Sequence, residues 1–72
     1  MNYRKTIINL REEKDWTQKE VALKLNISQR AYSHYENGTR QLPIDLLIKI
    51  SQLYGVTTDY ILGLSNNRKK AF

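Results

Sequence analysis

Residues 17–38, TQKEVALKLNISQRAYSHYENG, contain the signals that decide the fold. Thr17 can cap a helix, and Glu20 follows three residues later, which is the spacing of a capping box. Trp16 before the cap and Val21 at the fourth helical position are spaced as a hydrophobic staple. A helix is therefore predicted to begin after Thr17, with a buried face made of Val21, Ala22 and Leu25.

A second helix is predicted between Ser28 and Asn37, because Ser28 is a favourable N-cap and Gly38 can supply a left-handed C-cap. Its apolar side consists of Ile27, Ala31, Tyr32 and Tyr35. Its other side is polar and free of acidic residues, and consists of Gln29, Arg30, Ser33, His34 and Asn37. A turn of roughly three residues around Asn26 joins the two helices, so residues 17–37 are predicted to form a helix-turn-helix unit.

Three more helices are predicted in the flanking sequence. Apolar spacing indicates a first helix from about Asn2 or Tyr3 to Lys14. Pro43 is well placed as the first residue of a fourth helix that ends at Gly55, with core positions expected at Ile44, Leu47, Ile48, Ile50, Leu53 and Tyr54. A short fifth helix, capped by Thr57 or Thr58, would bury Tyr60, Ile61 and Leu64. The expected fold is all-α, a compact five-helix domain over residues 1–64, followed by a flexible basic tail over 65–72.

The composition excludes several kinds of protein. Seventy-two residues make one domain, and without Cys and with one His neither a disulfide nor a zinc site is expected. No apolar run exceeds three residues, so we expect no membrane partner and a cytoplasmic location. No nucleophile–base set or phosphate loop is present, so neither an enzymatic activity nor a cofactor is predicted. The net charge of +5 favours acidic partners, nucleic acid among them.

An ordered set of short motifs resembles the XRE family, the helix-turn-helix regulators typified by the repressor and Cro proteins of lambdoid phages. The motifs are TQKEVA at 17–22, LNIS at 25–28, YENG at 35–38 and GVTTDYILG at 55–63, with Ile7, Leu10 and Arg11 upstream. The resemblance covers roughly residues 3–64, nearly the whole chain. It implies a five-helix, lambda-repressor-like domain that binds operator DNA as a dimer.

The resemblance also implies residue roles. Base edges would be read by Gln29, Arg30, Ser33 and His34, and phosphates would be bound by Gln18, Ser28, Asn37, Thr39 and Arg40. Side-chain chemistry supports the base-reading assignments independently, because Arg pairs with guanine O6 and N7 and Gln pairs with adenine N6 and N7.

Glu36 is placed unfavourably, because the macrodipole disfavours an acid in the last turn of a helix. The resemblance implies a structural ion pair between Glu36 and Arg11 of the first helix.

Tyr32 and Tyr35 could stack on bases, as in single-strand binders, but their spacing favours core packing. Asp15 is expected to point away from phosphate, and the basic residues Arg68, Lys69 and Lys70 could either bind a phosphate or remain solvated.

These features predict a sequence-specific, double-stranded DNA-binding transcriptional regulator. The favoured mechanism is a repressor that occupies a near-palindromic operator as a homodimer, with the third helix of each subunit in the major groove. An antitoxin that also holds a toxin, and an activator that contacts polymerase, remain open. A protein-interaction module that keeps the fold without DNA binding is a further alternative, against which Gln29, Arg30 and His34 argue.

Overall fold

Five α-helices occur in residues 3–68, the part of the chain that the computed structural model describes, and no strand occurs there. They are α1 (Tyr3–Glu13), α2 (Gln18–Leu25), α3 (Gln29–Asn37), α4 (Ile44–Tyr54) and α5 (Thr58–Leu62). The all-α, five-helix fold predicted from the sequence is confirmed. Residues 1–2 and 69–72, and with them the predicted basic residues Lys69 and Lys70, lie outside the described residues.

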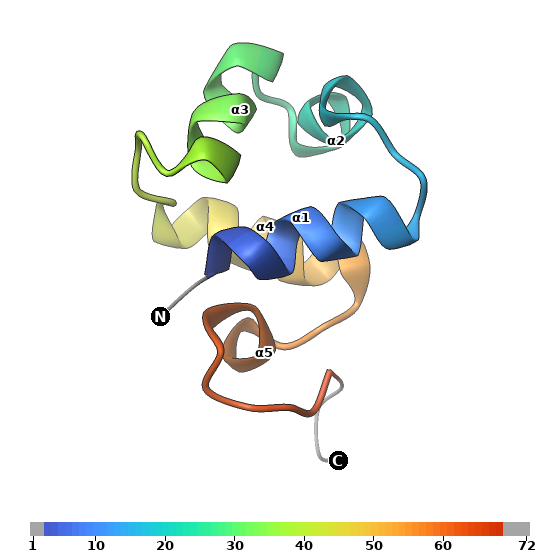
Figure 1. Cartoon of the computed structure of the whole chain (residues 1–72), viewed down its shortest axis with the longest axis vertical. Coiled ribbons are helices and arrows are strands. Elements are labelled where there is room, and N and C mark those ends of the chain that lie inside the picture. The colour runs from blue at the N-terminus through green and yellow to red at the C-terminus, as the bar shows by residue number, and fades with distance from the viewer. Residues whose placement is uncertain (1–2, 69–72) are drawn as a thin grey trace.

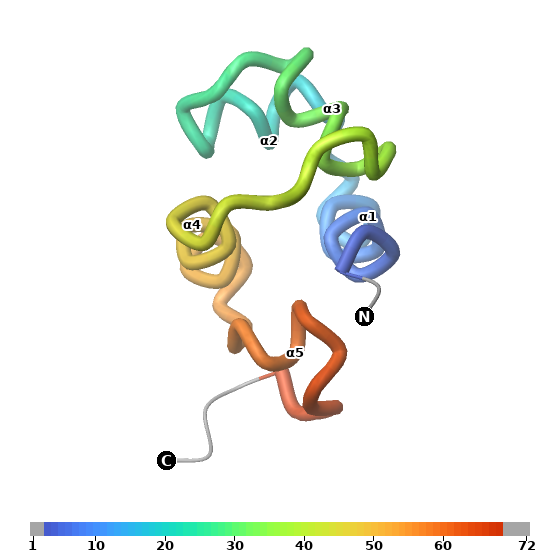
Figure 2. The backbone as a smooth tube through the Cα atoms, turned by 90° about the vertical axis from the view of Figure 1, so that its left-hand side faces the viewer, coloured from blue at the N-terminus to red at the C-terminus, as the bar shows by residue number. Residues whose placement is uncertain are grey.

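The helices are arranged in three levels. Helices α1 and α4 lie at the middle of the molecule, with α2 and α3 on one side of them and α5 on the other (Figures 1 and 2). Helix α3 packs on α1 and α2, while α2 also contacts α4 and α5 contacts both α1 and α4. This arrangement leaves the side of α3 that faces away from α1 uncovered (Figure 1).

The helix starts follow the capping residues that the sequence indicates. Thr17 Oγ1 accepts from the Glu20 amide at 3.1 Å, and Glu20 Oε1 accepts from the Thr17 amide at 2.9 Å, so the capping box is complete. Ser28 Oγ accepts from the Ala31 amide at 3.0 Å and begins α3. The tight turn between α2 and α3 depends on Asn26, whose φ of 61° lies in the left-handed region that Asn tolerates better than most residues.

The core contains the apolar residues expected from α1, α2 and α3, including Tyr32 and Tyr35. Its buried members are Ile7, Leu10, Val21, Ala22, Leu25, Tyr32, Tyr35, Leu46, Ile50 and Ile61. Packing of the two tyrosines in the core removes them as base-stacking candidates, because their rings are not accessible to nucleic acid.

Three expectations for the C-terminal half are wrong. Ile44 and Ile48 are 76% and 45% exposed, because the face of α4 that packs inward is the one that carries Leu46 and Ile50. Pro43 is the N-cap of α4 rather than its first residue, since its ψ of 152° is extended. Leu64 is 67% exposed, because α5 ends at Leu62 and Leu64 lies beyond the left-handed C-cap Gly63, where φ is 80°.

The described part of the predicted tail, residues 65–68, returns to the body of the domain. Arg68 forms two hydrogen bonds with Glu13 at the end of α1, at 2.8 and 2.6 Å, and a third with the Tyr60 hydroxyl at 3.1 Å. Its carbonyl accepts from the Thr57 amide at 2.8 Å. The guanidinium of Arg68 is therefore bonded within the domain. This contradicts the interpretation in which it is free to bind a phosphate.

Candidate nucleic-acid interface

The outward side of α3 brings the four predicted base-reading residues together. Gln29, Arg30, Ser33 and His34 line one shallow hollow, and Gln18 from the start of α2 completes it. Gln29 and Arg30 are exposed, and neither side chain makes a hydrogen bond or ion pair within residues 3–68. Their donors and acceptors are therefore available to a ligand that lies along α3.

The predicted phosphate-binding residues surround this hollow in two groups. Ser28 and Gln18 lie near the starts of α3 and α2, where backbone amides carry partial positive charge. Asn37, Thr39 and Arg40 lie at the end of α3 and in the loop that follows, and all three are exposed. The Ser28 oxygen is occupied as a helix cap, but its hydroxyl hydrogen can still be donated to a phosphate oxygen.

Gln18 differs from the sequence-based expectation, because part of its side chain is used inside the protein. Its Nε2 donates to Glu36 Oε1 at 2.9 Å. One hydrogen of the amide group and its oxygen remain for the hollow. Gln18 thus lies between the exposed side of α3 and a buried polar network on its inner side.

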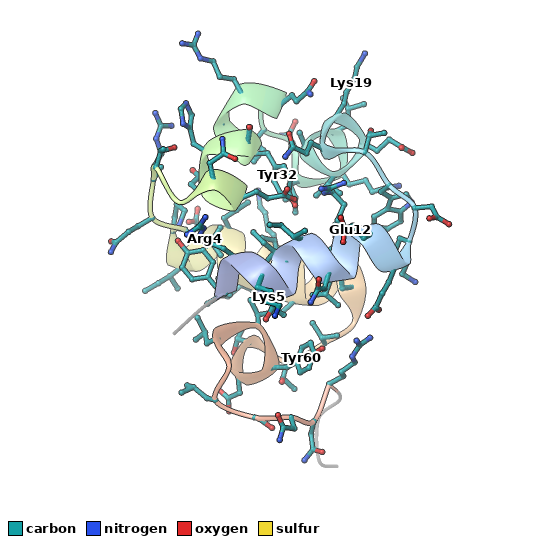
Figure 3. The ribbon with its side chains drawn as sticks, viewed as in Figure 1. Arg4, Lys5, Glu12, Lys19, Tyr32 and Tyr60 are labelled. Atoms are coloured by element: carbon teal, nitrogen blue, oxygen red, sulfur yellow. The ribbon has the colours of Figure 1, made fainter. Side chains whose placement is uncertain are left out.

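The network is centred on Glu36, which is only 4% exposed. Arg11 and Glu36, expected to pair, are joined by two hydrogen bonds, Nε to Oε2 at 2.8 Å and Nη2 to Oε1 at 3.2 Å. The Tyr32 hydroxyl also donates to Glu36 Oε2, and Figure 3 shows Tyr32 directed from α3 toward the centre of the molecule. Arg11 Nη1 is satisfied by the Trp16 carbonyl at 2.9 Å. The network ties α1, α2 and α3 together directly beneath the hollow.

Electrostatics agree with this geometry. Burial alone would raise the pKa of Glu36, but the hydrogen bonds from Arg11, Tyr32 and Gln18 outweigh it and lower that pKa below its ordinary value. Glu36 is therefore charged at neutral pH and compensated in place. Its unfavourable position at the C-terminal end of α3 is offset by the guanidinium of Arg11.

One contributor to this region was missed from the sequence. Arg4 Nε donates to the Glu36 carbonyl at 3.2 Å, and its guanidinium lies over Gly38, where an added Cβ would approach it to 2.7–2.9 Å (Figure 3). Arg4 thus supplies a hydrogen-bond donor to a carbonyl in the last turn of α3, which receives no hydrogen bond from an amide of the helix itself. The sequence feature that could have indicated this role is the spacing of seven residues between Arg4 and Arg11, which places both on the same side of α1.

A comparison with protein families decides the classification. The helix-turn-helix family model matches residues 7–61, which include α2 and α3. The chain belongs to the XRE-type helix-turn-helix family. Within this family, α2 and α3 are the two helices of the motif, and the hollow described above lies on its second helix.

Curated relatives from Bacillus subtilis (strain 168) agree with this assignment. The chain is 43% identical to the HTH-type transcriptional regulator ImmR over 70 residues, 97% of this chain and 55% of ImmR. It is 34% identical to the uncharacterized HTH-type transcriptional regulator YobD over 65 residues, 90% of this chain and 58% of YobD. It is 41% identical to the uncharacterized HTH-type transcriptional regulator YqaE over 59 residues, 82% of this chain and 51% of YqaE. The chain thus spans about half the length of these relatives, and no solved structure matches it significantly.

No helix in residues 3–68 is long and apolar enough to cross a membrane. No group of three or more His, Cys, Asp or Glu residues is arranged there so that it could hold a metal ion.

Proposed function

We propose that this chain is the DNA-binding part of a transcriptional regulator and that α3 enters the major groove of double-stranded DNA. The observation that carries the proposal is the outward side of α3, where Gln29 and Arg30 present exposed bonding groups that nothing in residues 3–68 satisfies. An α-helix fits the width of the major groove, and Arg and Gln have the geometry to pair with guanine and adenine there. Membership of the helix-turn-helix family supports the same orientation.

The proposed contacts divide into two kinds. Gln29, Arg30, Ser33 and His34 would read base edges, because they line the hollow on the outward side of α3. Gln18, Ser28, Asn37 and Arg40 would hold phosphates, because each retains at least one hydrogen-bond donor for a phosphate oxygen. Thr39 differs from this second group, because its amide donates to the His34 carbonyl and its hydroxyl is within hydrogen-bond distance of both that carbonyl and His34 Nδ1.

A homodimer that acts as a repressor by occupancy completes the proposal. Two subunits would place α3 in successive major grooves, roughly 34–36 Å apart, on a near-palindromic operator. The exposed Ile44 and Ile48 supply apolar surface on α4, and Ile48 borders a cleft against Val56 and the start of α5. This surface is our candidate for the contact between two copies, since a two-fold interface must be self-complementary.

Selection of bound duplexes from a random pool, repeated at two salt concentrations, tests the proposed function. We expect an enriched, two-fold symmetric site whose half-sites lie about 10 base pairs apart. Binding without sequence enrichment, with an affinity that falls steeply as salt is added, would contradict the proposal, because charge alone would then account for it. An enriched site without two-fold symmetry would overturn the homodimer but leave the reading role of α3 in place.

A further inference from the structure

His34 and Thr39 form a closed pair at the end of α3. The His34 Nδ1 atom lies 2.7 Å from Thr39 Oγ1. The Thr39 amide donates to the His34 carbonyl at 3.1 Å, and the Thr39 hydroxyl is 3.4 Å from the same carbonyl. Thr39 therefore contacts both the backbone and the ring of His34, although it is itself exposed.

The direction of these bonds determines how the imidazole is protonated. The Thr39 hydroxyl has a single hydrogen and lies near two atoms of His34, the carbonyl oxygen at 3.4 Å and Nδ1 at 2.7 Å. When that hydrogen is directed at the carbonyl, the hydroxyl oxygen accepts from His34, and the hydrogen of the neutral ring is on Nδ1. In that tautomer, Nε2 carries a lone pair and is a hydrogen-bond acceptor.

We propose that Thr39 is a positioning residue that holds neutral His34 with Nε2 as an acceptor, so that His34 selects an amino base over a keto base at one operator position. This inference rests on the proposed function, since it assigns a chemistry to one residue of the same hollow. In the major groove, adenine N6 and cytosine N4 are donors, whereas guanine O6 and thymine O4 are acceptors. An Nε2 lone pair therefore favours adenine or cytosine on the strand that it faces.

The tautomer can be measured without DNA. His34 is the single histidine of the chain, so its ring nitrogens give unambiguous signals in a long-range proton–nitrogen correlation spectrum. At about pH 8 we expect the ring hydrogen to be on Nδ1 and not on Nε2. In Thr39→Val, which keeps the shape but lacks the hydroxyl, the two tautomers should mix, and Thr39→Ser should restore the wild-type spectrum. A ring protonated on Nε2 in the wild-type protein would overturn the inference.

Duplex selection at about pH 8 measures the consequence for recognition. His34→Ala identifies the operator position concerned, as the one whose preference disappears. At that position the wild type should favour amino bases by about five-fold, the effect of one hydrogen bond. The preference should vanish in Thr39→Val and persist in Thr39→Ser.

The outcomes separate this inference from the function on which it rests. If Thr39→Val weakens binding equally on all sequences and leaves every base preference intact, Thr39 is a phosphate contact and the inference is wrong while the proposed function stands. If the wild type enriches no site, the proposed function itself fails.

Discussion

On its inward side α3 carries Tyr32, Tyr35 and Glu36, all buried, and on its outward side it carries Gln29 and Arg30, both exposed. Both sides are polar in part, but they differ in how their bonding groups are used. Glu36 accepts bonds from Arg11, Gln18 and Tyr32, whereas Gln29 and Arg30 make no hydrogen bond or ion pair within residues 3–68. A polar residue therefore indicates a binding role where its bonding groups remain open, and a structural role where they are satisfied inside.

The largest effect on stability is expected from Glu36→Gln. The substitution removes the charge that compensates Arg11 and should lower the free energy of unfolding by about 3 kcal/mol, because a buried ion would lose its partner. Urea unfolding measures this, and Glu20→Gln is the matched control, since Glu20 is exposed and Gln can still complete the capping box. A loss for Glu36→Gln no larger than that of the control would contradict the structural role of the network.

The same residue predicts an acid dependence. The pKa of Glu36 is lowered in the folded protein, so its stabilising contribution is complete above the unfolded-state value of 4.5 and is lost as pH falls through the lower folded value. The stability difference between wild type and Glu36→Gln should therefore shrink as the pH is lowered below about 4.5. Unfolding curves of both proteins over this range provide the test, and a difference that grew toward acid would show that the sign is wrong.

Two tyrosines whose hydroxyls are buried, Tyr32 and Tyr54, should give effects of intermediate size. Tyr32→Phe removes a hydrogen bond to a charged carboxylate and should cost about 2 kcal/mol. The Tyr54 hydroxyl is buried without a partner within the described residues, and burial, followed by the charge of Glu36, raises the pKa of Tyr54 to about 12. Tyr54→Phe should therefore leave the unfolding free energy unchanged or raise it slightly. Equal losses for the two variants would mean that the bond to Glu36 contributes nothing specific.

Gln18 lies at the border of the two sides, so Gln18→Ala should affect both properties. The lost bond to Glu36 should lower the unfolding free energy by about 1 kcal/mol, and loss of the remaining donor should weaken DNA binding on all sequences. Gln29→Ala is the control, expected to change stability by less than about 0.5 kcal/mol. If Gln18→Ala altered base preference while leaving stability unchanged, Gln18 would belong to the reading side alone.

The sequence predicted those features that depend on local chemistry. The capping box at Thr17 and Glu20, the cap at Ser28 and the apolar stripes of α2 and α3 all appear as expected, because they depend on residues close together in the chain. The four base-reading candidates meet in one hollow for the same reason, since they belong to one helix.

Features set by distant packing were not predicted. An apolar pattern alone does not reveal which side of α4 faces inward, so Ile44 and Ile48 were expected in the core. The bond between Gln18 and Glu36 joins positions 18 residues apart, and that between Arg68 and Glu13 joins positions 55 apart. Spacing rules within a helix do not reach such distances.

The central claim is that the outward side of α3 reads DNA sequence without contributing to stability, and Arg30→Ala tests it most directly. Its unfolding free energy and its base preferences, from selected duplexes, should be measured on the same preparation. We predict a change in stability below about 0.5 kcal/mol, together with a loss of about 1–3 kcal/mol on the selected site and relaxed preference at one base pair in each half-site. An equal loss of affinity on every sequence, or no loss at all, would contradict the claim.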